Sequence, residues 1–177
     1  MSDDYAYCPR CATRLEYREL FGKIRGICPA CEFIHFLDPK VAVVVFIERS
    51  DAVGRQVLLI QRASDPEKGR WALPAGFVDH GEDPKIAAMR EVSEETGLLV
   101  KVSGLLGVWR DNSAVIVIGY LAHVVGGTLY AGDDALDARW FGANNLPAPT
   151  ELGFDSTRRI LGLWQQHGHL DNLPVAN

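Results

Sequence analysis

The sequence lacks the features that mark membrane, secreted and repetitive proteins. In its 177 residues, no hydrophobic run approaches the roughly 18 apolar residues of a membrane span. The acidic, polar start MSDDYAY is unlike a signal peptide, and the chain contains no internal repeat or low-complexity segment. With 47% hydrophobic and 23% charged residues, the chain is long enough for one full core and a small accessory module. These features predict a cytoplasmic globular protein that has no membrane partner.

Positive charge is scarce. Eighteen Lys and Arg residues against 23 Asp and Glu residues give a formal net charge of -5. This balance argues against binding to nucleic acid through overall charge. For a polyphosphate substrate, it implies that metal ions must neutralise the site. The composition therefore predicts a metal-dependent protein with a small-molecule substrate and no nucleic-acid partner.

Cysteine is absent after residue 31. The four cysteines form two CxxC pairs, separated by sixteen residues: Cys8, Cys11, Cys28 and Cys31. This spacing is typical of a four-cysteine zinc ribbon, in which two pairs of thiolates complete a tetrahedral site. Disulfides are the alternative, but a reducing compartment disfavours them. We expect residues 1–37 to form a zinc ribbon, with a hairpin over residues 15–27 and a structural zinc ion.

The remaining residues, 38–177, have the pattern of a second domain, which follows a turn at Asp38-Pro39. Hydrophobic patterning predicts strands over residues 41–48, 56–61, 99–110, 114–124 and 138–141, with a turn at 111–113 and a helical turn at 144–146. Helices are predicted over residues 84–96 and 154–167. Strands on both sides of one amphipathic helix, followed by a second helix, predict an α+β fold whose sheet is covered on both faces.

The helix over residues 84–96 has clear ends and an unusual acidic face. Asp83 is a good N-cap, Pro84 suits the first helical position, and Gly97 is a typical stop. Three glutamates fall on one side of this helix: Glu91, Glu94 and Glu95. Like charges at this spacing repel each other, so helix stability alone does not explain them.

A divalent cation bound among these glutamates would turn their mutual repulsion into a net attraction to the ion. Oxygen ligands without neighbouring Cys or His favour Mg²⁺ or Mn²⁺ over zinc. We therefore expect Glu91 and Glu95, one turn apart, to bind the metal, with Glu94 as a third ligand. A solvated acidic helix face is the alternative.

The segment from Gly76 to Leu98 resembles the signature of the Nudix hydrolases. Gly76 is followed after five residues by Glu82, and after seven more by the run REVSEETGL that begins at Arg90. The resemblance implies an α/β/α sandwich on a mixed sheet over about residues 38–170. It also implies Mg²⁺- or Mn²⁺-dependent hydrolysis of a diphosphate that links a nucleoside to another group, and a homodimer.

The resemblance further implies roles for residues around this segment. The carbonyl of Ala75 would be a metal ligand, and Arg90 would pair with Glu82; a surface pair between Arg90 and Glu94 is the alternative. Asp134 would complete the catalytic carboxylates, although a solvated acidic turn explains it equally well.

Three more residues are candidates for substrate binding. Arg62, at the end of a predicted strand, would contact phosphate, and Phe77 and Trp71 would stack on a base or nicotinamide. The alternatives are an ordinary surface arginine and two core aromatics.

The combination of a zinc ribbon and this signature resembles NADH pyrophosphatases and a related group of ribbon-bearing FAD or ADP-ribose pyrophosphatases. The SQPWPFPxS stretch usual in the first group is absent from the corresponding segment LLGVWRDNSAVIVIGY. ADP-ribose or FAD, cleaved to release AMP, is therefore favoured over NADH or NAD-capped RNA.

A non-catalytic nucleotide-sensing regulator with a nucleic-acid-binding ribbon is an alternative of another class. Residues 1–37 carry five basic and five acidic residues, and this balance predicts no basic stripe.

Overall fold

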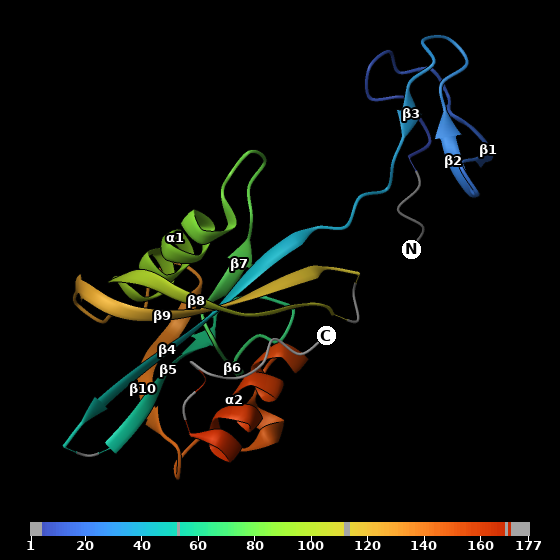
Figure 1. Cartoon of the computed structure of the whole chain (residues 1–177). Helices are drawn as coiled ribbons and strands as arrows, with labels where there is room; N and C mark the ends of the chain where they lie inside the picture. The colour runs from blue at the N-terminus through green and yellow to red at the C-terminus, as the bar shows by residue number, and fades with distance from the viewer. Residues whose placement is uncertain (1–4, 53, 112–113, 169, 171–177) are drawn as a thin grey trace. The chain divides into compact units, whose positions relative to one another are not determined.

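The computed structural model describes residues 5–52, 54–111, 114–168 and 170 (Figure 1). It divides into two compact units, residues 1–39 and 40–177. Among the described residues, no helix is long and apolar enough to cross a membrane.

The large unit is built on one mixed sheet. Its elements are β4 (Val41–Asp51), β5 (Gly54–Arg62), β6 (Trp71–Ala72), β7 (Ala75–Phe77), α1 (Pro84–Thr96), β8 (Leu98–Arg110), β9 (Ile116–Gly127), β10 (Ala135–Gly142), the 3-10 helix η1 (Pro149–Glu151) and α2 (Asp155–His167). The main strand order is β10-β5-β4-β9-β8, with β6 beside β5 and β7 beside β4. Strands β4 and β9 are parallel and the other pairs are antiparallel. The predicted α+β class with a mixed sheet is confirmed.

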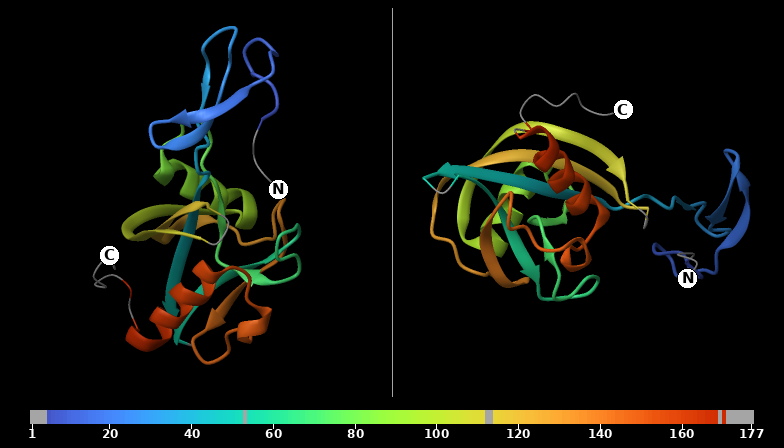
Figure 2. Two further views of the ribbon diagram at one scale, coloured as in Figure 1. Left: turned by 90° about the vertical axis from the view of Figure 1, so that its right-hand side faces the viewer. Right: turned by 90° about the horizontal axis from the view of Figure 1, so that it is seen from below.

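The dense hydrophobic run of β4 is explained by burial on both faces of the sheet. Val43 and Val45 pack in one core with residues of α1, whereas Val44 and Phe46 pack in a second core with residues of α2. Successive strand residues point to opposite faces, so a strand between two helical layers has no polar side. Figures 1 and 2 show α1 and α2 on opposite faces of the sheet, which is the predicted α/β/α sandwich.

Helix α1 begins and ends where the sequence predicts. The Asp83 carboxylate accepts a hydrogen bond from the Lys85 N–H at 2.7 Å, and Pro84 is the first helical residue. Gly97 ends the helix in the left-handed conformation, with φ of 68°. These local interactions set the two ends of the helix.

The other elements differ from the prediction at their ends. Strands β6 and β7 were not predicted, since two or three residues carry no periodic pattern. The helical turn predicted over residues 144–146 is an ordinary turn, and the short helix follows at Pro149. Helix α2 begins one residue later than predicted, because Phe154 has a positive φ of 55°. Residues 112 and 113 of the predicted turn lie outside the described residues.

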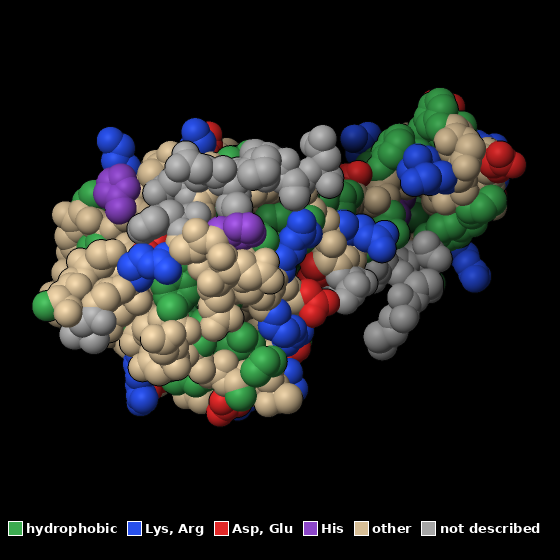
Figure 3. Space-filling model, turned by 60° about the horizontal axis from the view of Figure 1, so that its bottom comes forward, with side chains coloured by type: hydrophobic (Ala, Val, Ile, Leu, Met, Phe, Trp, Pro, Cys, Tyr) green, Lys and Arg blue, Asp and Glu red, His purple; other side chains and the backbone are tan. Residues whose placement is uncertain are grey.

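The small unit is a three-stranded antiparallel sheet of β1 (Glu16–Leu20), β2 (Lys23–Ile27) and β3 (Ile34–His35). Its buried hydrophobic residues are few: Cys8, Leu15, Ile27 and Cys28. By contrast, seven large hydrophobic side chains are exposed: Tyr5, Tyr7, Tyr17, Phe21, Ile24, Phe36 and Leu37. Figure 3 shows hydrophobic and basic side chains together on this unit. A core this small needs an additional source of stability.

Candidate functional site

Strand β7 brings its main chain against the acidic face of α1 at Gly76. A Cβ atom at Gly76 would lie 2.0 Å from Cδ of Glu91 and 2.1 and 2.2 Å from its two carboxylate oxygens. Any side chain here would displace that carboxylate. The close approach, rather than backbone conformation, therefore favours glycine at this position, because it leaves the Glu91 carboxylate in place.

Glu95 lies one turn after Glu91 and is almost fully buried, at 3% exposure. Its Oε2 accepts a hydrogen bond from the Ala75 N–H at 3.0 Å. Burial raises the pKa of Glu95 to about 8; the charges of Glu91 and Asp134 add to this effect, whereas the Ala75 hydrogen bond and the Arg62 charge oppose it. Burial also raises the pKa of Glu91. A cation among these groups would favour their charged forms.

The Ala75 carbonyl points to the same side of β7 as Glu95. Ala75 is opposite Val44 in the antiparallel pair, and its N–H is directed to Glu95 rather than to β4. In an antiparallel strand, the N–H and C=O of one residue point the same way. The carbonyl predicted to bind metal is therefore on the carboxylate side.

Arg90 connects the acidic residues of this site. Its Nε and Nη2 donate to the two carboxylate oxygens of Glu82, each at 2.9 Å, and Nη1 donates to Glu91 at 2.8 Å and Glu94 at 2.9 Å. Its Nη2 also donates to the Phe77 carbonyl at 3.0 Å. Both predicted partners, Glu82 and Glu94, thus bind the same guanidinium. The Glu94 side chain is 51% exposed, against 14% for Glu91.

The pair between Arg90 and Glu82 fixes the loop before α1. The Arg90 hydrogen bonds lower the pKa of Glu82 to about 2, and Glu82 also accepts from the Asp79 N–H at 3.0 Å. A two-point contact of this kind sets both distance and direction. It holds the loop and helix together, while the hydrogen bonds of Arg90 go to residues other than Glu95.

A loop before β10 brings Asp134 near Glu95. The Gly132 N–H donates to the Glu95 carbonyl at 2.9 Å, and a Cβ atom at Gly132 would lie 1.7 Å from the Glu94 carbonyl oxygen. The Asp134 carbonyl accepts from the Ala63 N–H at 3.0 Å. Gly132 thus permits the contact between this loop and α1, and the charge of Asp134, two residues later, contributes to the raised pKa of Glu95.

A cleft of about 190 Å³ adjoins the Ala75–Gly76 main chain. Its lining includes Arg62 and Phe77 among the predicted residues. Three polar or aromatic residues of the lining were not predicted: Asp111, Phe154 and Ser156. No local pattern marks them, since they come from a strand end and a helix start far apart in the sequence.

Two side chains of this cleft contact each other. The guanidinium of Arg62 lies 4.8 Å from the ring centroid of Phe154, and its Nε donates to the Pro66 carbonyl at 2.8 Å. Arg62 is therefore held in place in the cleft, and its positive charge opposes the rise in the pKa of Glu95.

Trp71 lies elsewhere. It packs edge-on against Phe141, with ring centroids 4.8 Å apart, and it is not among the residues that line the cleft. Its predicted contact with substrate remains a prediction.

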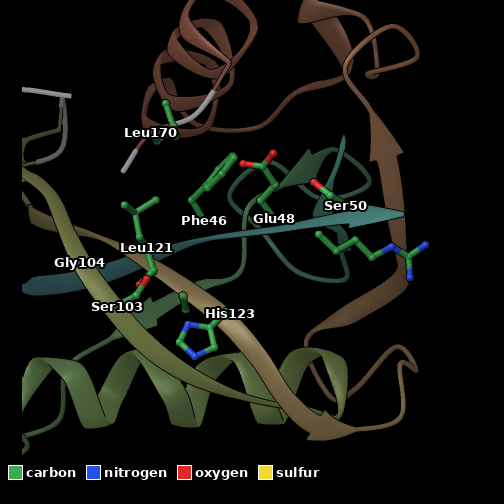
Figure 4. Close-up of a pocket in the computed structure, with 10 residues that line it drawn as sticks. Phe46, Glu48, Ser50, Ser103, Gly104, Leu121, His123 and Leu170 are labelled. Carbon is green, nitrogen blue, oxygen red and sulfur yellow. The ribbon is translucent and has the colours of Figure 1, made fainter. Parts of the chain in front are cut away.

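A hollow larger than this cleft lies away from the acidic site. It has a volume of about 570 Å³ and is lined by β4, β8 and β9, including Phe46, Glu48, Ser103 and His123 (Figure 4). None of the predicted site residues lines it. Size therefore does not identify the site here, whereas the convergence of carboxylates and main chain at β7 does.

The four cysteines of the small unit form a compact cluster. Their Sγ atoms all lie within 4.8 Å of one another, and three of the pairs are 3.4, 3.5 and 3.7 Å apart. A tetrahedral zinc site with Zn–S bonds of about 2.3 Å places its sulfurs roughly 3.8 Å apart. A disulfide requires about 2.05 Å, and the four thiols are free. The donor set therefore fits zinc.

The two CxxC turns have the same main-chain pattern. Ala12 donates to the Cys8 carbonyl at 2.9 Å, as Glu32 donates to the Cys28 carbonyl at 3.0 Å. Ala12 and Glu32 have positive φ values of 58° and 57°. The similar local chemistry of CPRC and CPAC thus produces two similar knuckles.

The comparison with family models agrees with the geometry of the acidic site. The model described as the NUDIX domain matches residues 38–161, which include β7, α1 and Asp134. The chain belongs to the Nudix family. The acidic face of α1 and the glycine of β7 are therefore the Nudix signature in its folded form.

Several known proteins are similar to this Nudix chain. An ADP-ribose pyrophosphatase of Methanocaldococcus jannaschii is 46% identical over 130 residues, 71% of this chain and 73% of that protein. An NAD-capped RNA hydrolase, NudC, of Vibrio cholerae is 31% identical over 158 residues, 86% of this chain and 55% of that protein. The chain spans about half the length of the NudC proteins that it matches.

A solved structure extends the similarity to the whole chain. A NUDIX hydrolase from Nitrosomonas europaea has a TM-score of 0.86 and 28% identity, and the match covers 98% of this chain and 97% of that one. That similarity includes the small unit as well as the Nudix domain.

Proposed function

We propose that this Nudix hydrolase cleaves the diphosphate bond of ADP-ribose and releases AMP. The observation that carries the proposal is the convergence of the Glu91 and Glu95 carboxylates on the Ala75–Gly76 main chain. The relative that is 46% identical and named an ADP-ribose pyrophosphatase supports the choice of substrate. FAD, whose diphosphate also joins AMP to a second group, is the second substrate of this class.

Mg²⁺ or Mn²⁺ is the proposed catalytic cofactor. Glu91, Glu95 and the Ala75 carbonyl would hold it, with Glu94 as a further ligand. The fit rests on the oxygen-only donors and on the space that Gly76 leaves for the Glu91 carboxylate. When bound, such an ion polarises the phosphorus–oxygen bond and lowers the pKa of an attacking water.

The other residues position groups or contact substrate. Arg90 and Glu82 hold the loop against α1, so that the carboxylates face the β7 main chain. Asp134 adds a negative charge beside Glu95 and is the candidate for accepting a proton from water. Arg62 contacts a phosphate, and Phe77, which is 50% exposed, stacks on the base.

Hydrolysis of NADH, or of the NAD cap of RNA, is the second candidate. It is supported by the identity of 31% to the NudC protein of Vibrio cholerae. The same carboxylates would serve, since the bond broken is again a diphosphate. A non-catalytic regulator is disfavoured, because the arrangement retains all the carboxylates of the signature.

We further propose the organisation of the chain. Residues 1–37 form a zinc ribbon held by its four cysteines, and residues 38–177 form the Nudix domain. The protein is a homodimer in the cytoplasm, where the thiols remain reduced.

An assay with a panel of substrates tests the proposed activity. With Mg²⁺ or Mn²⁺, we expect AMP from ADP-ribose with a kcat/KM roughly tenfold or more above that for NADH, because the two second groups differ in size and contacts. FAD and NAD-capped RNA complete the panel, and a reaction without divalent ion is the control. Faster cleavage of NADH would favour the second candidate, and no AMP from any substrate would refute both proposed reactions.

A further inference from the structure

Strands β1 and β2 gather three cations on one face of the small sheet. Arg18 and Arg25 are direct cross-strand partners, and Lys23 is two residues before Arg25, so its side chain lies on the same face. Like charges directly opposite each other destabilise a sheet. Within the part of the chain that the structure describes, no carboxylate forms an ion pair with any of the three. Arg25 donates to the Leu20 carbonyl at 3.2 Å, but no carboxylate of the described residues neutralises the three positive charges.

The strand register separates the acidic residues from these cations. Glu19 is opposite Ile24, which places it on the other face of the sheet. Glu16 shares the face of Arg18 and is diagonal to Arg25, but it forms no ion pair with either and is at the opposite end of the strand pair from Lys23. The balanced composition of residues 1–37 predicts no basic surface, whereas the register creates one.

Two exposed phenylalanines accompany the cations. The Arg25 guanidinium lies 4.6 Å from the ring centroid of Phe36, which is 46% exposed. Phe21 is at the hairpin tip next to Gly22, is 74% exposed and has a positive φ of 53°. The favoured two-residue hairpin loop has positive φ at both central residues, so the turn accounts for this conformation, whereas the exposure of the ring has no such explanation. Neither ring is explained by the core of the unit.

We propose that this basic face binds single-stranded RNA. It consists of Arg18, Lys23, Arg25 and Phe36, with Phe21 at its tip. Cations that follow a phosphate chain, together with aromatic rings that stack on bases, are the usual means of binding single strands. Complementary charge favours RNA over a protein partner, because three neighbouring cations suit a chain of phosphates. The proposal is independent of the ADP-ribose activity.

Fluorescence anisotropy of a labelled 12-nucleotide oligouridine with a 5′-hydroxyl tests this binding on the full, zinc-loaded chain. Three phosphate contacts predict a slope of about -2 for log K against log salt, a loss of roughly 20-fold in affinity between 50 and 200 mM salt. Arg18→Gln with Arg25→Gln leaves one contact, and we expect the slope to fall to about -0.7. Phe36→Ala should weaken binding by roughly fivefold or more, through loss of one stack.

The matched control is Arg10→Gln with Arg14→Gln, which removes the same charge from the same unit at positions outside strands β1 and β2. It should leave the affinity and the salt slope near those of the parent. Equal losses from the two double variants, or no saturable binding at 50 mM salt, would overturn the proposal. The proposal would also be overturned, in favour of a protein interface, by a second combination of results. In that case the parent does not bind RNA, and Phe21→Ala changes the oligomeric state. ADP-ribose turnover, measured in parallel, shows whether the proposed activity stands separately.

Discussion

Replacing Glu95 by Gln is expected to lower kcat for ADP-ribose by roughly 10²- to 10³-fold, the range for loss of one electrostatic group of an active site. Glu95 is buried at 3% exposure, and its carboxylate meets the main chain of β7. Gln keeps the volume and one oxygen that accepts from the Ala75 N–H, but it removes the negative charge. The loss should therefore appear in turnover, with little change in fold.

Steady-state kinetics with Mg²⁺ and circular dichroism of the variant check this result. Glu19→Gln is the matched control, since Glu19 is exposed in the small unit and is absent from the acidic site. The control should retain the parental rate. A Glu95→Gln variant with parental kcat would remove Glu95 from the proposed mechanism. If the variant does not fold, the same measurement is made on Glu91→Gln.

Replacing Cys28 by Ser is expected to abolish zinc binding and unfold the small unit. Cys28 is 1% exposed and belongs to a core of very few residues. A structural zinc ion contributes on the order of 10 kcal/mol to such a domain, far more than this core supplies. Elemental analysis should find about one zinc per parent chain, as expected for one closed site of four thiolates, and none in the variant. The ¹H–¹⁵N spectrum should lose its dispersed signals from the small unit only.

Comparison of Cys11→Ser with Cys28→Ser shows whether the cysteines act as zinc ligands or only as packing residues. Cys11 is exposed and contributes little to the core, yet its Sγ lies 3.4 Å from that of Cys28. If the four thiolates hold zinc, the two variants should fail alike. A folded, zinc-containing Cys11→Ser protein beside an unfolded Cys28→Ser protein would contradict the four-cysteine site.

Features fixed by neighbouring residues were predictable. The bounds of α1 follow from Asp83, Pro84 and Gly97, whose effects act within one turn. The two-sided burial of β4 follows from its unbroken hydrophobic run. Both patterns are complete within about a dozen residues, so the sequence alone contains the information.

Features that depend on distant pairing were not predictable. The short strands β6 and β7 form only because β5 and β4 supply partners. Amphipathic spacing places Glu95 on an acidic face, but its burial results from β7 and the loop that contains Gly132. Likewise, Phe154 reaches the cleft, and Arg18 meets Arg25, through tertiary position and register.

The central claim is that the acidic face of α1 binds a divalent ion against β7. Titration of Mn²⁺ into the zinc-loaded protein, with free Mn²⁺ followed by electron paramagnetic resonance, tests it directly in the absence of substrate. We expect saturable binding by the parent and a loss of roughly 10-fold or more in affinity for Glu91→Gln, since loss of a ligand should cost at least as much as loss of a residue that only orients one. Identical Mn²⁺ binding by the parent and by Glu91→Gln would contradict the account.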